Sequence, residues 1–228
     1  MKKVISIALV HLSLILLVAC QPAEQAKKTV QKPSSQSTTT PTVVKSEDGF
    51  ERAYFASGCF WCVEAVYESV KGVKESISGY SGGHTEYPTY ESTNTGKTGH
   101  AETVEIIYDA SKVSFSDLVD VYFGSQNITQ VNGQGPDWGS QYRSILFYQN
   151  DEQKNIIDTK ISKIEQQIGK GKVAAEVKPF EKFWIGEDYH QNFERRHPNN
   201  AYIANVSKPR FRRFQSQFPH LLKDGVNH

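Results

Sequence analysis

The stretch Gly58-Cys59-Phe60-Trp61-Cys62-Val63-Glu64 organises this chain, because it places two thiols on either side of two aromatic residues. An apolar run over residues 53–56 comes just before it and predicts a strand. Beyond it, apolar residues recur at helical spacing, so we expect a helix that begins at or near Cys59. The sequence therefore predicts a strand, a CxxC pair and a helix in direct succession.

This placement of the two thiols predicts redox chemistry. Cys59 would face the unpaired N–H groups and the positive end of the helix dipole, which favour the thiolate and therefore a nucleophile. Cys62 lies one turn further on, close enough to attack an oxidised form of Cys59. A structural disulfide and two buried thiols are the alternatives, although so small a loop restrains little unfolded-chain entropy.

Composition narrows the class of protein. The length of 228 residues suits one sizeable domain with appendages. A formal net charge of +1 gives no global field for nucleic acid or an acidic partner. The 11 tyrosines and 12 phenylalanines suit a packed core with aromatic-lined pockets.

The first residues predict export. The basic segment Met1-Lys2-Lys3 precedes an apolar run over residues 4–18, which is too short for a comfortable membrane span and is typical of a signal peptide. The run ends in Leu17-Val18-Ala19-Cys20, which resembles a bacterial lipobox and implies cleavage before Cys20 and lipidation of its thiol. Ordinary secretion and an uncleaved anchor are the alternatives. Lipidation would leave the other two cysteines as a pair.

The predicted domain organisation has four parts: a lipoprotein signal peptide over residues 1–19, a disordered tether over 20–47, a catalytic domain over 48–222 and a flexible end over 223–228. The tether is rich in Thr, Ser, Gln, Lys and Pro, so it cannot bury apolar surface. We expect an exported, membrane-anchored lipoprotein of the bacterial periplasm or cell envelope. Gln21, which is not acidic, favours the outer membrane by analogy with Gram-negative sorting rules.

Within the domain, strands and helices are expected to alternate. Strands are predicted over residues 53–56, 73–81, 101–108, 141–148 and 173–177, and helices from Cys59, over 114–123 and over 150–169. The order β-α-β, β-α-β predicts an α+β fold, a ferredoxin-like plait or roll with extra elements. Residues 82–99 are predicted to be a functional loop. The C-terminal tail after Phe180 is expected to be irregular, with its basic residues on a solvated face.

The GCFWCVE stretch resembles the active-site signature of the peptide methionine sulfoxide reductase A family, and the resemblance extends from about Glu51 to Tyr202. Further motifs in the family's order carry it: Gly79-Tyr80-Ser81-Gly82-Gly83, Pro88-Thr89-Tyr90, Thr98-Gly99-His100-Ala101-Glu102, Gly139-Ser140-Gln141-Tyr142-Arg143-Ser144 and Asp188-Tyr189-His190-Gln191. The resemblance implies an α/β roll with an irregular tail. It also implies no bound cofactor and thiol-dependent reduction of methionine S-sulfoxide, free or within proteins.

The same resemblance implies a role for each site residue. Cys59 would attack the sulfoxide sulfur and be left as a sulfenic acid. Glu102 would protonate the oxygen, with a pKa that aromatic surroundings raise. The other matches are Tyr90 and Tyr142 as donors to the oxygen, Phe60 and Trp61 as the wall at the methyl group, and Asp137 as the site aspartate.

Each of these residues also has an ordinary structural interpretation. Glu102 could be an exposed strand residue, the two tyrosines could be half-buried core residues, and Asp137 could form a turn. The rings of Phe60 and Trp61 could simply pack at the start of a helix. His100 and His190 are expected to be structural hydrogen-bonding residues.

Cys62 departs from the commonest family pattern, which has glycine there and resolving cysteines near the C-terminus. This chain has no cysteine after Cys62. Elimination among three cysteines therefore predicts that Cys62 is the sole resolving thiol. The Cys59–Cys62 disulfide would then be reduced by a thioredoxin-like donor.

Two other functions remain open. A thioredoxin-like disulfide oxidoreductase shares the strand–CxxC–helix arrangement, but bulky Phe60 and Trp61 would crowd dithiol exchange. A zinc-binding or adhesive surface lipoprotein could combine the two cysteines with His84 or His100, although their spacing is unlike that of closed structural sites. For the reductase we expect a monomer without metal or nucleic acid. Its partners would be oxidised proteins, free methionine sulfoxide, a thioredoxin-like protein and the membrane.

Overall fold

The computed structural model describes residues 40–45 and 49–226. The predicted signal peptide, Cys20 and most of the predicted tether lie outside this part, so those predictions stay predictions. Within the described residues, none of the helices combines the length and apolarity that a membrane crossing requires.

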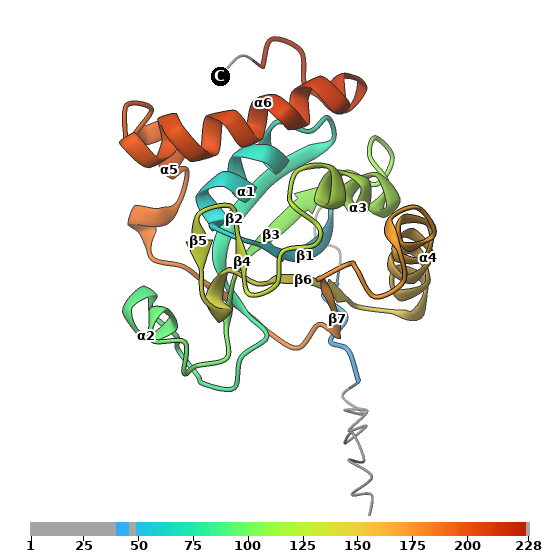
Figure 1. The fold of residues 1–228 in the computed structure, drawn as a ribbon, viewed down its shortest axis with the longest axis horizontal. Coiled ribbons are helices and arrows are strands. Elements are labelled where there is room, and N and C mark those ends of the chain that lie inside the picture. Colours follow the sequence, from blue (N-terminus) through green and yellow to red (C-terminus); the bar gives the residue numbers. More distant parts are fainter. Residues whose placement is uncertain (1–39, 46–48, 227–228) are drawn as a thin grey trace, which may run out of the picture. The chain divides into compact units, whose positions relative to one another are not determined.

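A six-stranded sheet forms the centre of the domain (Figure 1), with strands in the order β7-β6-β1-β3-β2-β8. The strands are β1 (Glu51–Ser57), β2 (Val73–Ser81), β3 (Ala101–Tyr108), β6 (Ser144–Tyr148), β7 (Glu176–Pro179) and β8 (Phe183–Ile185). Neighbouring strands are antiparallel except β6 and β7, which are parallel.

Two helices connect the central strands. These are α1 (Phe60–Glu68), between β1 and β2, and α3 (Phe115–Gly124), between β3 and β6. Apart from shorter elements in the connections, the order is β1-α1-β2-β3-α3-β6, which is compatible with the predicted ferredoxin-like plait. The α+β class is therefore confirmed, with β7 and β8 added at the two edges of the sheet.

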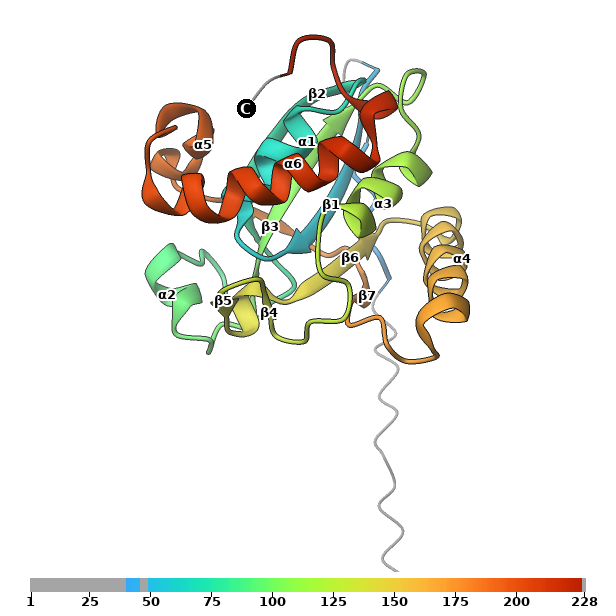
Figure 2. The ribbon, with the colours of Figure 1, turned by 45° about the horizontal axis from the view of Figure 1, so that its top comes forward.

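Successive residues of β1 point to opposite faces of the sheet and divide the core in two. Phe55 belongs to the larger apolar cluster, together with residues of α1, α3 and α6 (Lys208–Gln217). Figure 2 shows these three helices on one side of the sheet. Tyr54 packs on the other face, where its ring stacks on that of Phe180 at 3.8 Å between centroids. Residues 53–56 of β1 are buried on both faces, which agrees with the apolar run in the sequence.

Local capping signals define the helix starts where the sequence predicts them. Ser114 and Asp117 form a reciprocal capping box at α3. Asn150 caps α4 (Asp151–Ile168) by accepting a hydrogen bond from the backbone N–H of Gln153 at 2.9 Å.

Several elements differ from the prediction. The segment 82–99 contains a short helix, α2 (Tyr90–Asn94), and the glycine-rich segment 127–139 contains a hairpin of β4 (Gly133–Gln134) and β5 (Asp137–Trp138). The strand predicted from Gln141 begins at Ser144, because a 3₁₀ turn, Ser140–Tyr142, precedes it. The last predicted strand, 173–177, lies instead at β7.

The C-terminal tail is more regular than expected. It contains α5 (Phe193–Arg196), a π-helical turn (Ile203–Ser207) and the ten-residue helix α6. The expectation of a solvated basic face is wrong for Arg210, which is only 6% exposed. Its guanidinium donates to Ser125 O at 2.6 Å and Ser57 O at 2.9 Å. These bonds satisfy a charge that would otherwise be costly to bury.

Both described ends of the domain make backbone contacts with it. Thr42 N donates to Phe180 O at 2.6 Å, and Val44 N donates to the side chain of Gln149 at 2.8 Å. At the other end, Lys223 N donates to Ser69 O at 2.8 Å. Residues 40–45 of the predicted tether and the first residue of the predicted flexible end are thus hydrogen-bonded to the domain.

Candidate active site

A small cavity of about 150 Å³ lies at the N-terminal end of α1. Its lining contains seven of the sequence-predicted site residues and one more, Tyr202: Cys59, Phe60, Trp61, Tyr90, Glu102, Asp137, Tyr142 and Tyr202. Cys62 does not line this cavity. Segments from five parts of the chain therefore meet around the first thiol.

The turn before α1 presents Cys59 to the cavity. Gly58 has a φ of 85°, and a Cβ there would lie 2.5 Å from the Cβ of Gln134, so only glycine fits. Cys59 is the N-cap residue of α1 and is 7% exposed. The residue is therefore almost enclosed, and it lines the cavity.

The expectation of an acidic Cys59 thiol is wrong in this reduced state. Burial raises the pKa of Cys59 well above its ordinary value, and the adjacent Cys62 and Glu102 raise it further. The thiol of Cys59 is therefore neutral at neutral pH.

Glu102 lies at the beginning of β3, is 2% exposed and meets the start of α1. Its Oε2 accepts a hydrogen bond from Phe60 N at 2.9 Å, which leaves Oε1 to carry a proton. Burial raises the pKa of Glu102 to about 8, against that hydrogen bond, and the negative charge of Asp137 adds to the increase. The carboxyl group is thus neutral at pH 7 and can act as an acid.

Two tyrosine hydroxyls complete the polar part of the cavity. Tyr90 begins α2, and its N–H donates to Glu187 Oε1 at 2.9 Å. Tyr142 ends the 3₁₀ turn before β6. Burial raises the pKa of both side chains, so both hydroxyls stay protonated and can donate to an oxygen.

The aromatic wall is held by residues outside the cavity. The ring of Trp61 stacks on that of Phe193 at 3.7 Å between centroids, and Trp61 Nε1 donates to His190 Nδ1 at 3.0 Å. His190 also packs against Phe60, with 4.7 Å between ring centroids. His190 therefore orients both rings and does not line the cavity.

His100 is equally structural in its contacts. Its Nδ1 accepts a hydrogen bond from Gly83 N at 3.2 Å, and its Nε2 lies 2.8 Å from Thr85 O. These two contacts select the neutral tautomer that carries its proton on Nε2. Burial lowers the pKa of His100, which agrees with a neutral ring.

Tyr202 lines the cavity although the sequence analysis did not place it there, because its segment carries no motif. Its hydroxyl donates to Asp137 Oδ2 at 2.5 Å and lies 3.8 Å from Cys62 Sγ. Asp137 also forms the β4–β5 hairpin, so its turn role and its place at the site coincide. Tyr202 links the second thiol to the cavity that holds the first.

Cys62 lies behind the cavity on α1 and is 2% exposed. Both cysteines are free thiols in this structure. A hydrogen bond from Cys59 lowers the pKa of Cys62, and the positive charge of Arg210 lowers it further, against the effect of burial. In the reduced pair the second thiol is thus the more acidic of the two.

Comparison with known proteins identifies the family. A family model described as "Peptide methionine sulfoxide reductase" matches residues 51–222. The chain belongs to this family. The reductase is 46% identical to peptide methionine sulfoxide reductase MsrA of Saccharolobus solfataricus over 173 residues, which are 76% of this chain and 97% of that protein. It is 43% identical to the MsrA of Pasteurella multocida over 173 residues, covering 76% and 99% of the two chains.

Solved structures resemble the reductase in fold. Methionine sulfoxide reductase A of Corynebacterium diphtheriae superposes with a TM-score of 0.62 at 30% identity, covering 69% of this chain and 79% of that chain. Reduced Mxr1 of Saccharomyces cerevisiae superposes with a TM-score of 0.60 at 28% identity, covering 70% and 92%.

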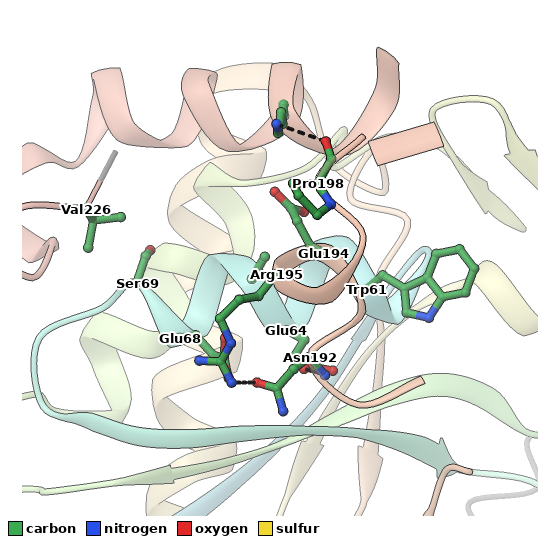
Figure 3. A pocket seen from close by; sticks show the side chains of 11 residues that line it. Trp61, Glu64, Glu68, Ser69, Asn192, Glu194, Arg195, Pro198 and Val226 are labelled. Atoms are coloured by element: carbon green, nitrogen blue, oxygen red, sulfur yellow. Dashed lines mark hydrogen bonds between the residues drawn. The ribbon is translucent and has the colours of Figure 1, made fainter. Parts of the chain in front are cut away.

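A larger pocket of about 460 Å³ lies on the other side of Trp61 and contains no thiol among its lining residues. Figure 3 shows the indole ring at one end, turned away from Glu64 and Arg195. Glu64 is buried there and accepts hydrogen bonds from Ser78 Oγ and Asn192 N, which tie the segment before α5 to α1 and β2. The hydrogen bonds of Glu64 therefore support the aromatic wall from outside the cavity that holds Cys59.

The arrangement of ligating side chains does not favour a zinc protein. Across residues 40–45 and 49–226, no three or more His, Cys, Asp or Glu residues are grouped so that they could hold a metal ion. The match to the reductase family over residues 51–222 favours the reductase over a thioredoxin-like disulfide oxidoreductase.

Proposed function

We propose that the protein reduces the S-epimer of methionine sulfoxide, free or within proteins, to methionine. The observation that carries this proposal is the cavity, which brings together a buried thiol, a neutral carboxyl group and two tyrosine hydroxyls beside an aromatic wall. A sulfoxide needs a soft nucleophile at sulfur and an acid at oxygen, and its methyl group needs an apolar slot. The cavity offers all three.

In the first step Cys59 attacks the sulfoxide sulfur while Glu102 protonates the oxygen. Tyr90 and Tyr142 donate hydrogen bonds to that oxygen, and Phe60 and Trp61 hold the S-methyl group. The hydroxyl group then passes from the substrate sulfur to Cys59 Sγ and the bond between the two sulfurs breaks. Methionine leaves, and Cys59 remains as a sulfenic acid. The thiol proton lost from sulfur equals the proton gained at oxygen, so a neutral Cys59 and a neutral Glu102 suffice.

In the second step Cys62 attacks the sulfenic sulfur of Cys59, releases water and forms a Cys59–Cys62 disulfide. The positive charge of Arg210, which lowers the pKa of Cys62, supports this order of events, because the thiolate is the attacking form. A thioredoxin-like dithiol then reduces the disulfide.

Turnover on separated S and R epimers of methionine sulfoxide tests the proposed function. We expect the wild type to form methionine from the S epimer at least about a hundredfold faster than from the R epimer, because one enzyme type serves each epimer. Cys59→Ser serves as the blank and should form none from either. Equal rates on both epimers, or turnover by Cys59→Ser, would contradict the proposal.

We further propose that the reductase is a lipoprotein, anchored at Cys20 and tethered by the polar segment that follows, in a bacterial envelope. The basic start, the apolar run and Leu17-Val18-Ala19-Cys20 support this proposal. Fractionation of cells that express the full chain tests it. Wild type should sediment with membranes and incorporate labelled fatty acid, and Cys20→Ser should incorporate none; label retained by Cys20→Ser would refute the anchor.

A further inference from the structure

A second cavity, of about 380 Å³, opens onto Cys62. Its walls come from the end of α3, the β4–β5 hairpin and the segment that leads into α6. Cys59 does not line it, just as Cys62 does not line the smaller cavity. Asp137 and Tyr202 line both cavities and form the partition between them. Each thiol therefore has its own cavity.

The geometry of disulfide exchange gives this second cavity a use. A thiolate attacks one sulfur of a disulfide from the side opposite the leaving sulfur. Attack on Cys62 with Cys59 as the leaving group therefore comes from the side of Cys62 that faces away from Cys59. The departing Cys59 is released into the smaller cavity, where the carboxyl group of Glu102 can supply its proton.

The charge around the second cavity suits an incoming thiolate. Two arginines and one carboxyl group, that of Asp137, line it, and the excess of positive charge favours an anion near Cys62. Arg210 is buried and fixed by its hydrogen bonds to Ser125 O and Ser57 O. Arg213 lies one turn further along α6 and is exposed. One cation thus stands inside the cavity and the other at its rim.

We propose that the electron donor, a dithiol protein of the thioredoxin type, enters through this second cavity and attacks Cys62, so that substrate and donor use different mouths. The proposal rests on the Cys59–Cys62 disulfide of the proposed function. The donor thiolate forms a bond to Cys62 Sγ, the Cys59–Cys62 bond breaks, and Cys59 leaves and takes up a proton. The donor's second thiolate then attacks the donor's first sulfur in the mixed disulfide, and Cys62 is released as a thiol. The donor departs oxidised by two electrons.

Matched variants of the reductase test whether the donor uses the second cavity. Asn205 lines the second cavity and is exposed, whereas its exposed neighbour Ala204 does not line it. We expect Asn205→Trp to slow re-reduction of the oxidised enzyme by thioredoxin at least about tenfold, since small misplacements of reacting atoms cost large factors in rate. Ala204→Trp should stay within about twofold of wild type, and both should form one methionine per chain without donor.

A charge reversal gives a second pair. Arg213 lines the cavity and Arg212 does not, although both are exposed on α6. Arg213→Glu should lower the rate constant for thioredoxin at low salt by about three- to tenfold, and added salt should shrink this difference. Arg212→Glu makes the same change in net charge and should have less than half that effect.

The site of attack can be read directly. Thioredoxin that lacks its second active-site cysteine is mixed with the oxidised reductase, and the trapped disulfide is mapped by fragmentation of the peptide that holds both cysteines. Donor sulfur on Cys62 supports the proposal. Donor sulfur on Cys59, or unchanged re-reduction in Asn205→Trp, overturns it. Failure to form methionine in a single turnover would instead count against the proposed function.

Discussion

Cys62→Ser is expected to form one methionine per chain and then stop. Cys59 keeps its cavity in this variant, so attack on the sulfoxide still proceeds and leaves the sulfenic acid. No other cysteine follows in the chain to form a disulfide with Cys59. Thioredoxin therefore has no intramolecular disulfide to reduce. Single-turnover and steady-state assays on the same preparation measure the two phases.

Cys20→Ser is the matched control for this experiment, because it removes the third cysteine and leaves the pair intact. We expect it to recycle with thioredoxin at the wild-type rate. Unimpaired recycling in Cys62→Ser, or loss of recycling in Cys20→Ser, would contradict the assignment of Cys62 as the resolving thiol.

Glu102→Gln is expected to lower the rate of the first turnover by about 10²- to 10⁴-fold, the usual contribution of a general acid. Glutamine retains the volume of the side chain and can still accept the hydrogen bond from Phe60 N, but it has no proton to transfer. Glu64→Gln is the control, because Glu64 is also a buried glutamate, with a pKa raised by burial to about 7, and it does not line the cavity. It should keep the rate within about threefold.

Glu102→Gln lowers activity, but at high pH it should raise the free energy of unfolding relative to wild type. The pKa of Glu102 is about 8 in the folded state against an ordinary value of 4.5. Between these pH values the folded protein holds a proton that the unfolded chain has lost, so the free energy of unfolding falls as pH rises through this window. Glutamine does not titrate, so the free energy of unfolding of Glu102→Gln does not fall through this residue as pH rises. From pH 5 to pH 8, urea unfolding should show Glu102→Gln gaining about 1 to 3 kcal/mol relative to wild type.

If Glu102→Gln is less active than wild type but more stable relative to it at pH 8, Glu102 acts as an acid and not as a structural residue. If Glu102 were an ordinary strand glutamate, its replacement would leave the first turnover unchanged. If the pH profiles of unfolding for wild type and Glu102→Gln ran parallel, the raised pKa would be refuted.

The elements that local chemistry defines could be predicted from the sequence. Ser114 and Asn150 cap their helices because each side chain bonds a backbone N–H three residues on, which the sequence shows directly. The strands β2 and β3 were predicted with the bounds that the structure has. Helix α2 was missed because it is a five-residue helix inside a polar, glycine-rich segment, where its only signal is the cap at Thr89.

Properties set by tertiary burial could not be predicted. The helix N-terminus at Cys59 suggests an acidic thiol, but burial by the packing around the cavity raises the pKa of this thiol. Arg210 belongs to a basic segment that predicts a solvated face, yet it is buried because oxygens from distant parts of the chain accept its hydrogen bonds. Tyr202 reaches the site only through the fold of the tail.

The roles of the other cavity residues came from the resemblance and not from spacing. Cys59, Tyr90, Glu102 and Tyr142 are far apart in the sequence, and no periodicity places them together. The structure brings all four to one cavity.

The mass of the Cys62→Ser chain after exposure to one equivalent of methionine S-sulfoxide, without donor, tests the central claim most directly. If Cys59 is the nucleophile, the chain gains the mass of one oxygen atom at Cys59 and one methionine appears per chain. A dimedone adduct should form at that residue. Methionine formed without any gain of oxygen at Cys59, or oxygen found on another residue, would contradict the account.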